Sequence, residues 1–221
     1  MSSHAAAAPR TISPTGLARG LAVTAGLGVG AYFVWKYVPQ YFVFTEASYG
    51  GYFWPRASWV LPHVALALTA TVIGPLQLWA RVRDRYRRFH RIAGRTYIIA
   101  VAGGAAASIG LSTSAGFTPA YRCGLFFLAI AWLATTGMAF AAVRRRNFTQ
   151  HREWMIRSYV VTFSFVTFRV FRDIAVAHGL ATFGEMNAVM AWACWAVPLL
   201  ITEIWFQSRA IFRTSGAVTS S

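Results

Sequence analysis

Long apolar runs alternate with short arginine-rich segments along this chain. Six runs are long enough for a membrane span, at 17–38, 58–80, 96–114, 121–143, 158–177 and 187–207. A transmembrane helix needs about 20 mainly apolar residues to cross a hydrocarbon layer about 30 Å thick. Each run must be helical, because backbone groups in lipid have no water to bond. The pattern therefore predicts an all-α integral membrane bundle of six transmembrane helices.

The same pattern divides the chain into four parts. We expect a disordered cytoplasmic leader at 1–16, a first transmembrane helix with an outer aromatic loop at 17–57, a five-helix membrane domain at 58–207 and a disordered cytoplasmic tail at 208–221. The basic, acid-free leader also fits a signal or transit peptide. Since the following apolar run can span and no small-x-small cleavage site follows it promptly, we interpret it as a retained helix, with a mitochondrial presequence as the alternative.

Basic residues are distributed unevenly between the two sides of this predicted bundle. Sixteen of the 21 fall on the side of the termini and of the second and fourth connections, and three fall on the other side. Cytoplasmic loops carry an excess of lysine and arginine. The bias predicts a multi-pass protein of the bacterial inner membrane with both termini in the cytoplasm.

Two stretches of sequence resemble each other. The stretch HRIAGRTY at 90–97 is echoed by HREWMIRSY at 151–159, and each follows an arginine-rich helix end and opens the next span. Predicted helices 2-3 and 4-5 are therefore interpreted as two parallel copies of one hairpin, an arrangement known from other membrane folds. The alternative is a chance likeness between two basic loops.

Composition supports the membrane interpretation. Hydrophobic residues make up 57% of the chain and charged residues only 12%, against about a quarter charged in soluble domains. The net charge of +15 could indicate nucleic acid, but its placement between apolar runs is typical of topology determinants and of anionic lipid contacts. We predict the lipid bilayer as partner and no nucleic acid. Cys123 and Cys194 lack metal-ligand spacing and are expected as two free buried thiols, with one bridge as the alternative.

The two basic connections are candidate anion sites. A histidine among guanidinium groups can hold an acidic headgroup, a phosphate or a carboxylate, with arginine providing bidentate contacts. Alternatively, the arginines only set topology and the histidines cap the hairpins. Anionic lipid headgroups rank above any soluble ligand here. The candidate residues are His90, Arg91, Arg95, His151, Arg152 and Arg157.

A second group of polar residues lies inside the predicted spans. Arg169, Arg172 and Asp173 fall within 158–177, and charges at such depth usually face the bundle interior or a wet cavity. Arg169 and Asp173 are four residues apart, so they share a helix face and can pair. The expected outer-half cluster also contains His63 and His178, whereas Gln77 and Glu203 are expected nearer the cytoplasmic face.

Three functions could use this cluster: a b-type haem held by the outer-side histidines His63 and His178, a proton or ion pathway, or a structural network that joins helices. The chain has no glycine-rich phosphate loop, HExxH, CxxC or nucleophile elbow. We therefore assign no catalytic residue, expect no enzyme of soluble type, and predict no cofactor apart from the haem alternative.

Several motifs together resemble a known family. They are His90 to Tyr97, Leu133 to Thr136, His151 to Tyr159 with Thr162 and Thr167 to Arg169, His63 with Gly74 to Gln77, and Trp192 to Trp195 with Pro198 and Glu203. The combination resembles the uncharacterised bacterial membrane family catalogued as domain of unknown function 2306, over about residues 58 to 207. The resemblance implies a polytopic membrane protein of unassigned activity, with His63, Arg169 and Glu203 at family-typical positions. Leu199 departs from the asparagine expected after Pro198.

These observations favour a non-enzymatic membrane protein. It would act as an accessory or assembly subunit of another membrane protein, or as a small-solute or proton-handling module whose working site is the outer-half cluster. The alternative is a membrane electron-transfer protein that binds haem b through His63 and His178.

Overall fold

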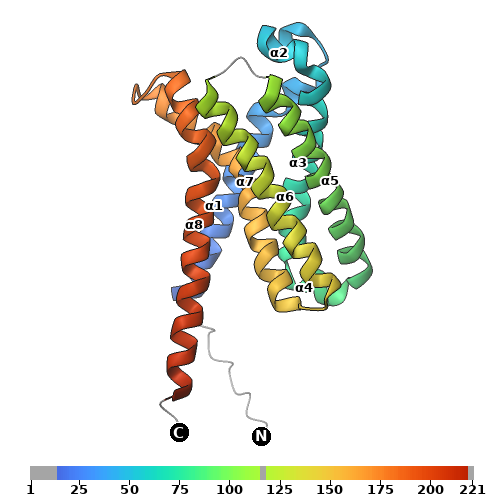
Figure 1. Ribbon diagram of the computed structural model, residues 1–221, viewed down its shortest axis with the longest axis vertical. Coiled ribbons are helices and arrows are strands. Elements are labelled where there is room, and N and C mark those ends of the chain that lie inside the picture. Colours follow the sequence, from blue (N-terminus) through green and yellow to red (C-terminus); the bar gives the residue numbers. More distant parts are fainter. Residues whose placement is uncertain (1–13, 115–117, 219–221) are drawn as a thin grey trace, which may run out of the picture.

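The computed structural model describes residues 14–114 and 118–218, and this part of the chain is helical, with no strand (Figure 1). The prediction of an all-α fold is confirmed, and a long helix lies on each of the six apolar runs. The elements in order are α1 (Pro14–Tyr37), η1 (Pro39–Phe42), α2 (Glu46–Phe53), η2 (Trp54–Arg56), α3 (Ala57–Leu78), α4 (Ala80–Arg85), α5 (Arg87–Ser114), α6 (Pro119–Arg144), α7 (Phe148–Ala177) and α8 (Phe183–Val218).

Two helical hairpins form the centre of the bundle. Helix α3 packs along α5, α6 packs along α7, and α5 packs against α6. Helix α8 packs on α6 and α7, and α1 contacts α7 on the other side of the bundle. We call the end that carries η1, α2 and η2 the α2 end. The opposite end, with α4 and the turn at 145–147, is the arginine-rich end, and both the start of α1 and the end of α8 point toward it (Figure 1).

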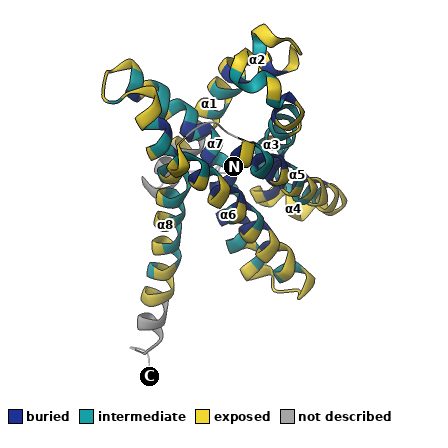
Figure 2. Cartoon of the chain, turned by 45° about the horizontal axis from the view of Figure 1, so that its top comes forward, coloured by how far each residue is buried: buried dark blue, intermediate teal, exposed yellow. Residues whose placement is uncertain are grey.

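Four helical segments of the described residues are long and apolar enough to cross a membrane. They are Glu46–Leu78, Arg87–Ser114, Pro119–Arg144 and Phe183–Phe212. Large apolar side chains cover much of their outer surface, such as Ile99 at 68% exposed and Leu200 at 60% exposed (Figure 2). This surface suits lipid rather than water. The chain is thus a multi-pass membrane protein, whereas α1 and α7 are not among these four segments and the count of six spans stays a prediction.

Side-chain caps set where the second hairpin begins. The Thr118 hydroxyl accepts a hydrogen bond from the Tyr121 backbone N–H, and Pro119 occupies the first turn of α6. The Asn147 side chain accepts a hydrogen bond from the Gln150 backbone N–H at 3.1 Å and caps α7. Asparagine and threonine suit this position because their oxygens bind backbone N–H groups that the helix leaves unpaired.

The basic connections are shorter than the sequence predicts. Helix α5 begins at Arg87 and α7 begins at Phe148, so His90 and His151 lie in first helical turns and not in loops. The Nδ1 atom of His151 hydrogen-bonds the Ala139 carbonyl at 2.8 Å, whereas the Nδ1 atom of His90 is buried without a partner. The two hairpins therefore differ at this point, and their origin as a repeat stays a prediction.

The structure differs from the sequence predictions at the end of the chain and at one cysteine. Helix α8 continues to Val218, past residue 208, where a disordered tail was expected. The expected leader at 1–16 falls largely outside the described residues. Both cysteines are free, as predicted, but Cys123 is exposed, and only Cys194 is buried.

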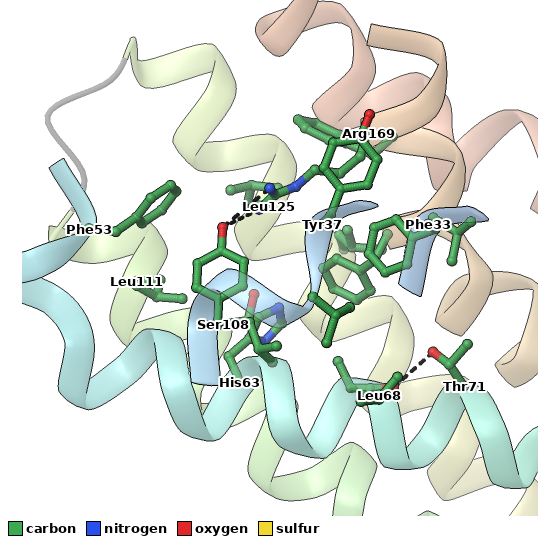
Figure 3. A pocket seen from close by; sticks show the side chains of 18 of the residues that line it. Phe33, Tyr37, Phe53, His63, Leu68, Thr71, Ser108, Leu111, Leu125 and Arg169 are labelled. Atoms are coloured by element: carbon green, nitrogen blue, oxygen red, sulfur yellow. Dashed lines mark hydrogen bonds between the residues drawn. The ribbon is translucent and has the colours of Figure 1, made fainter. Parts of the chain in front are cut away.

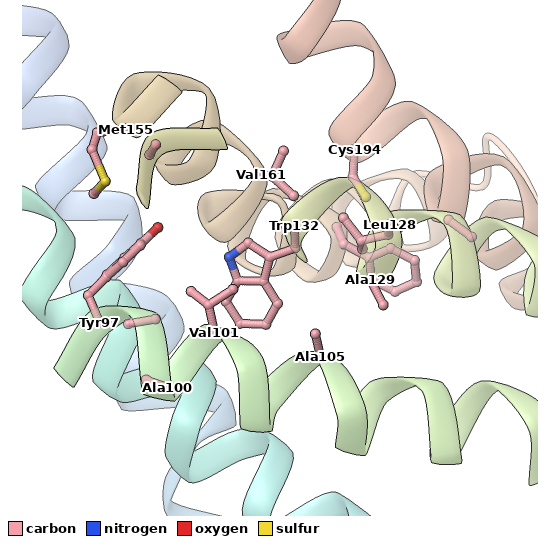
Figure 4. Packing of buried hydrophobic residues seen from close by; sticks show 14 residues of the cluster. Tyr97, Ala100, Val101, Ala105, Leu128, Ala129, Trp132, Met155, Val161 and Cys194 are labelled. Carbon is pink, nitrogen blue, oxygen red and sulfur yellow. The ribbon is translucent and has the colours of Figure 1, made fainter. Parts of the chain in front are cut away.

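A buried indole forms the centre of the apolar core. Trp132 of α6 is fully buried, and it packs with Val101 and Ala105 of α5 (Figure 4). Small residues on α5 make room for it, since a Cβ atom at Gly104 would lie 3.2 Å from the indole ring. Because membrane helices gain little from excluding water, such close packing is a main source of their association.

A hydroxyl network joins α5, α6 and α7 beside this indole. The Thr162 hydroxyl donates to the Ser158 carbonyl at 2.9 Å and lies 2.8 Å from both Trp132 Nε1 and the Tyr97 hydroxyl. Its proton is therefore used, and it accepts from both neighbours. The Tyr97 hydroxyl must then accept from Ser158 Oγ at 2.8 Å, and Ser158 Oγ from Thr136 Oγ1 at 2.7 Å. Each hydroxyl therefore donates to the next one in the order Thr136, Ser158, Tyr97 and Thr162.

Candidate functional site

A pocket lies inside the bundle toward the α2 end, between α1, η1, α2, α3, α5, α6 and α7 (Figure 3). Its volume is about 130 Å³. Most of its wall is aromatic or aliphatic, and a few polar side chains project from different helices, as is usual for small-molecule sites. The polar and aromatic lining residues are Phe33, Tyr37, Tyr41, Tyr52, Phe53, His63, Thr71, Ser108, Tyr121, Phe165, Phe168 and Arg169.

Arg169 brings a positive charge to this pocket from the middle of α7. Its two terminal nitrogens each lie 3.3 Å from the Tyr41 hydroxyl, to which they donate, and its guanidinium carbon lies 5.9 Å from the centre of the Tyr41 ring. No carboxylate among the described residues forms an ion pair with it. Among the described residues, the Arg169 guanidinium thus contacts the hydroxyl and ring of Tyr41, which carries no formal charge.

The pair that the spacing of Arg169 and Asp173 allows does not form. Asp173 forms an ion pair with Arg172, with 2.6 Å between Nη2 and Oδ1, and accepts hydrogen bonds from Arg172 Nε at 2.8 Å and from the Tyr37 hydroxyl at 2.5 Å. Arg172 also stacks on Phe183 of α8, with 4.7 Å between its guanidinium carbon and the ring centre. The carboxylate thus ties α7 to α1 and leaves Arg169 to the pocket, because the neighbouring guanidinium and the tyrosine of another helix satisfy it.

His63 of α3 faces Arg169 across the same pocket. Its Nδ1 lies 3.0 Å from the Gly104 carbonyl, and its ring packs edge-on against Phe165. A carbonyl oxygen can only accept, so Nδ1 carries the proton and Nε2 of the neutral ring is an acceptor. His178, the other proposed haem ligand, ends α7 as an exposed residue and is not part of the pocket wall. The structure does not bring the two histidines together.

The polar residues predicted nearer the arginine-rich end form separate contacts. Glu203 of α8 accepts hydrogen bonds from Nε and Nη2 of Arg157, at 2.9 and 2.6 Å. Arg157 is only 8% exposed and lies between the rings of Trp154 and Phe206. Gln77 is also 8% exposed, and its amide nitrogen has no hydrogen-bond partner in the part of the chain that the structure describes. None of Arg157, Glu203 and Gln77 reaches the pocket.

The remaining basic candidates lie at the arginine-rich end. Arg91, Arg95 and Arg152 are exposed there, Arg91 and Arg152 on the second turns of α5 and α7 and Arg95 on the third turn of α5. On the neighbouring α4, the Arg83 guanidinium beside Asp84 lowers the pKa of that carboxyl. Across the described residues, no group of three or more histidine, cysteine, aspartate or glutamate side chains could hold a metal ion.

Sequence reasoning missed the tyrosines of the pocket. Tyr37 lies at the end of the first predicted span at 17–38, and Tyr41 lies in the outer aromatic loop that follows it, which contains η1. In the structure this segment folds over the pocket, and Tyr41 is 4% exposed. The signal was present as a high density of aromatic residues beside Pro39, but such density is equally typical of an interfacial belt.

Comparison with known proteins gives a family and nothing more specific. The profile of the family described as Predicted membrane protein (DUF2306) matches residues 60–206. The chain belongs to the DUF2306 family. No curated protein and no solved structure matches it. The DUF2306 match includes His63 and Arg169, whereas α1, η1 and α2 precede it, so the pocket is built from both parts of the chain.

Proposed function

We propose that this chain is a non-enzymatic membrane protein that binds a small anionic solute in the pocket beside Arg169. It would act as a small-solute or proton-handling module. The observation that supports the proposal is a guanidinium inside an aromatic-walled cavity without a carboxylate partner among the described residues. Intramembrane ionisable residues are costly, and they usually mark substrate or ion pathways.

The energetics favour an anion over a neutral solute. Removing a charge from water costs several kcal/mol even after relaxation, unless an opposite charge and hydrogen bonds offset it. A guanidinium has five N–H donors, and Arg169 directs two of its nitrogens at one hydroxyl oxygen at the long distance of 3.3 Å. A carboxylate or a similar anion can accept two parallel N–H bonds from such a group.

Calorimetry on the full chain in lipid nanodiscs tests this function. The probes are acetate, hexanoate and benzoate, with benzamide as the uncharged control. We expect at least one of the acids to bind, and Arg169→Gln to weaken it by about 10- to 100-fold, because the lost contact is charge-assisted. Arg152→Gln removes the same charge from an exposed site on the same helix and should leave binding unchanged. Absence of binding by every acid, or equal binding by the Arg169→Gln variant, would overturn the proposal.

The membrane arrangement can be proposed in more detail. We infer six spans with the arginine-rich end in the cytoplasm of a bacterial inner membrane, because basic residues gather where the start of α1, α4, the turn at 145–147 and the end of α8 lie. Fluorescent-protein and alkaline-phosphatase fusions after residue 218 test it. We expect fluorescence and no phosphatase activity, and the reverse result would contradict the orientation.

We also propose that the arginine-rich end contacts anionic lipid headgroups. Arg91, Arg95 and Arg152 are exposed there, while Arg157 is occupied by Glu203. Quantifying phosphatidylglycerol and cardiolipin that co-purify in mild detergent tests the contact. The double change Arg91→Gln and Arg152→Gln should lower the amount of both lipids, whereas Lys36→Gln should not. Full retention by the double variant would contradict the proposal.

A further inference from the structure

The pocket combines one fixed donor with one fixed acceptor. Arg169 only donates hydrogen bonds. The opposite side chain, His63, has its Nδ1 proton committed to the Gly104 carbonyl, so its Nε2 carries a lone pair and has no partner among the described residues. A solute that presents an anionic group to the arginine and an O–H group to the histidine would satisfy both.

The size and wall of the pocket restrict the body of such a solute. A volume of about 130 Å³ is close to that of an engineered apolar cavity of about 150 Å³ that holds benzene in another protein. The aromatic rings of the wall come from α1, α2 and α7 and include Phe33, Phe53, Phe165 and Phe168. Aromatic rings pack favourably edge-on or offset against one another. A single six-membered aromatic ring is therefore the body that fits in both volume and contact geometry.

Charge excludes the closest alternative, a neutral quinol. A quinol also has one ring and O–H groups for His63, but it would leave the Arg169 charge unbalanced in a low-dielectric site. A carboxylate on the ring removes that charge. The ring hydroxyl then distinguishes the solute from simple benzoate.

We propose that the solute is a hydroxylated aromatic monocarboxylate of one ring, with its carboxylate on Arg169 and its hydroxyl donating to His63 Nε2. This inference rests on the proposed anion binding and adds the chemical class of the anion. It makes His63 the residue that determines specificity, and Arg169 the residue that supplies most of the affinity.

Calorimetry with a matched set of probes tests the class. The probes are benzoate, the three hydroxybenzoate isomers and the corresponding methoxybenzoates, with the full chain in nanodiscs. We expect one hydroxybenzoate to bind about 3- to 10-fold more tightly than benzoate, as for a neutral hydrogen bond. The matching methoxybenzoate has no hydroxyl proton and should bind no more tightly than benzoate. This comparison needs no variant, so it holds even if a His63 variant fails to fold.

A conservative variant assigns the preference to His63. In His63→Asn, the side-chain amide retains a donor for the Gly104 carbonyl, but its remaining acceptor, Oδ1, lies on a shorter side chain and no longer reaches the position of Nε2. We expect the ratio of the hydroxybenzoate and benzoate affinities to fall to about one, with the benzoate affinity itself nearly unchanged. A ratio that stays high in a folded variant would overturn the role of His63.

The outcomes separate this inference from the proposed function. If benzoate and all hydroxybenzoates bind equally, and Arg169→Gln weakens them all, the hydroxyl preference is wrong and anion binding stands. If decylubiquinol binds more tightly than every acid, the carboxylate class is wrong. If no acid binds, or if Arg169→Gln leaves the affinity for the acids unchanged, the proposed function itself is wrong.

Discussion

The hydroxyl network predicts that removing the hydroxyl of Thr162 destabilises the fold more than removing the hydroxyl of Thr136. Thr162 accepts from Trp132 Nε1 and from the Tyr97 hydroxyl while donating to a carbonyl, whereas Thr136 only donates, to Ser158 Oγ. Changing either residue to valine keeps the side-chain shape and removes the hydroxyl. Thr162→Val leaves two buried donors without an acceptor. Thr136→Val leaves none.

The magnitudes follow from that difference. A buried group left without a partner costs about 1–3 kcal/mol, and hydrogen bonds between membrane helices average about 0.6 kcal/mol because the unfolded chain also finds partners. We expect Thr162→Val to lower the free energy of unfolding by about 2–4 kcal/mol, counting two orphaned donors near the low end of that range. Thr136→Val should lower it by about 0.6–1 kcal/mol.

The two cysteines provide the assay. Cys194 is 3% exposed and Cys123 is exposed, so in a Cys123→Ser background a thiol-reactive fluorogenic dye reports only the opening of the core. Titration with SDS in mild detergent then gives the free energy of unfolding for each variant. If Thr136→Val is as destabilising as Thr162→Val, the assignment of donors and acceptors in the network is wrong.

Two further predictions use the same assay. Gly74→Ala places a Cβ atom against the Tyr159 ring and should lower the free energy of unfolding by about 1–3 kcal/mol. The control Gly137→Ala places its Cβ atom where no described atom lies within 4 Å, so it should be neutral or stabilising. Equal effects of the two changes would show that α3 and α7 do not pack this closely. Glu203→Gln should lower the free energy of unfolding by about 1–2 kcal/mol, because the buried Arg157 loses its nearer carboxylate and keeps only Glu153 at 3.9 Å. The glutamate side chain is 43% exposed, which limits the loss. The double variant with Arg157→Met should recover part of this loss, and no recovery would contradict the pairing.

The sequence predicts where the helices lie much better than which of their faces meet. Apolar length alone locates all six long helices, because lipid requires it. In a bilayer the outward face is as apolar as the inward one, so no amphipathic stripe indicates the partner of a helix. The burial of Trp132 and of Thr162, on different helices, could not be predicted for this reason.

The partners of single charged residues in the site could not be predicted from the sequence either. Position along α7 makes Arg169 a residue to examine, but its spacing from Asp173 does not reveal the partner of either side chain. The decisive partners are Tyr41 and Tyr37, which lie more than a hundred residues earlier in the chain. Only the folding of the η1 segment over the bundle brings them there.

The division of the pocket wall between two parts of the chain has a consequence for how such proteins can diversify. The charged and histidine-bearing wall lies within the DUF2306 match at 60–206, whereas Phe33, Tyr37 and Tyr41 precede it. The second part is a continuous N-terminal segment that ends at η2, and it meets the central hairpins through few polar contacts, such as Tyr37 with Asp173 and Arg56 with the Ser114 carbonyl, which an exchanged segment would have to keep. Grafting this segment from one family member onto another would redesign the lid of the pocket while retaining the anchor for the anion, which makes the junction near residue 57 a natural point for building chimeras.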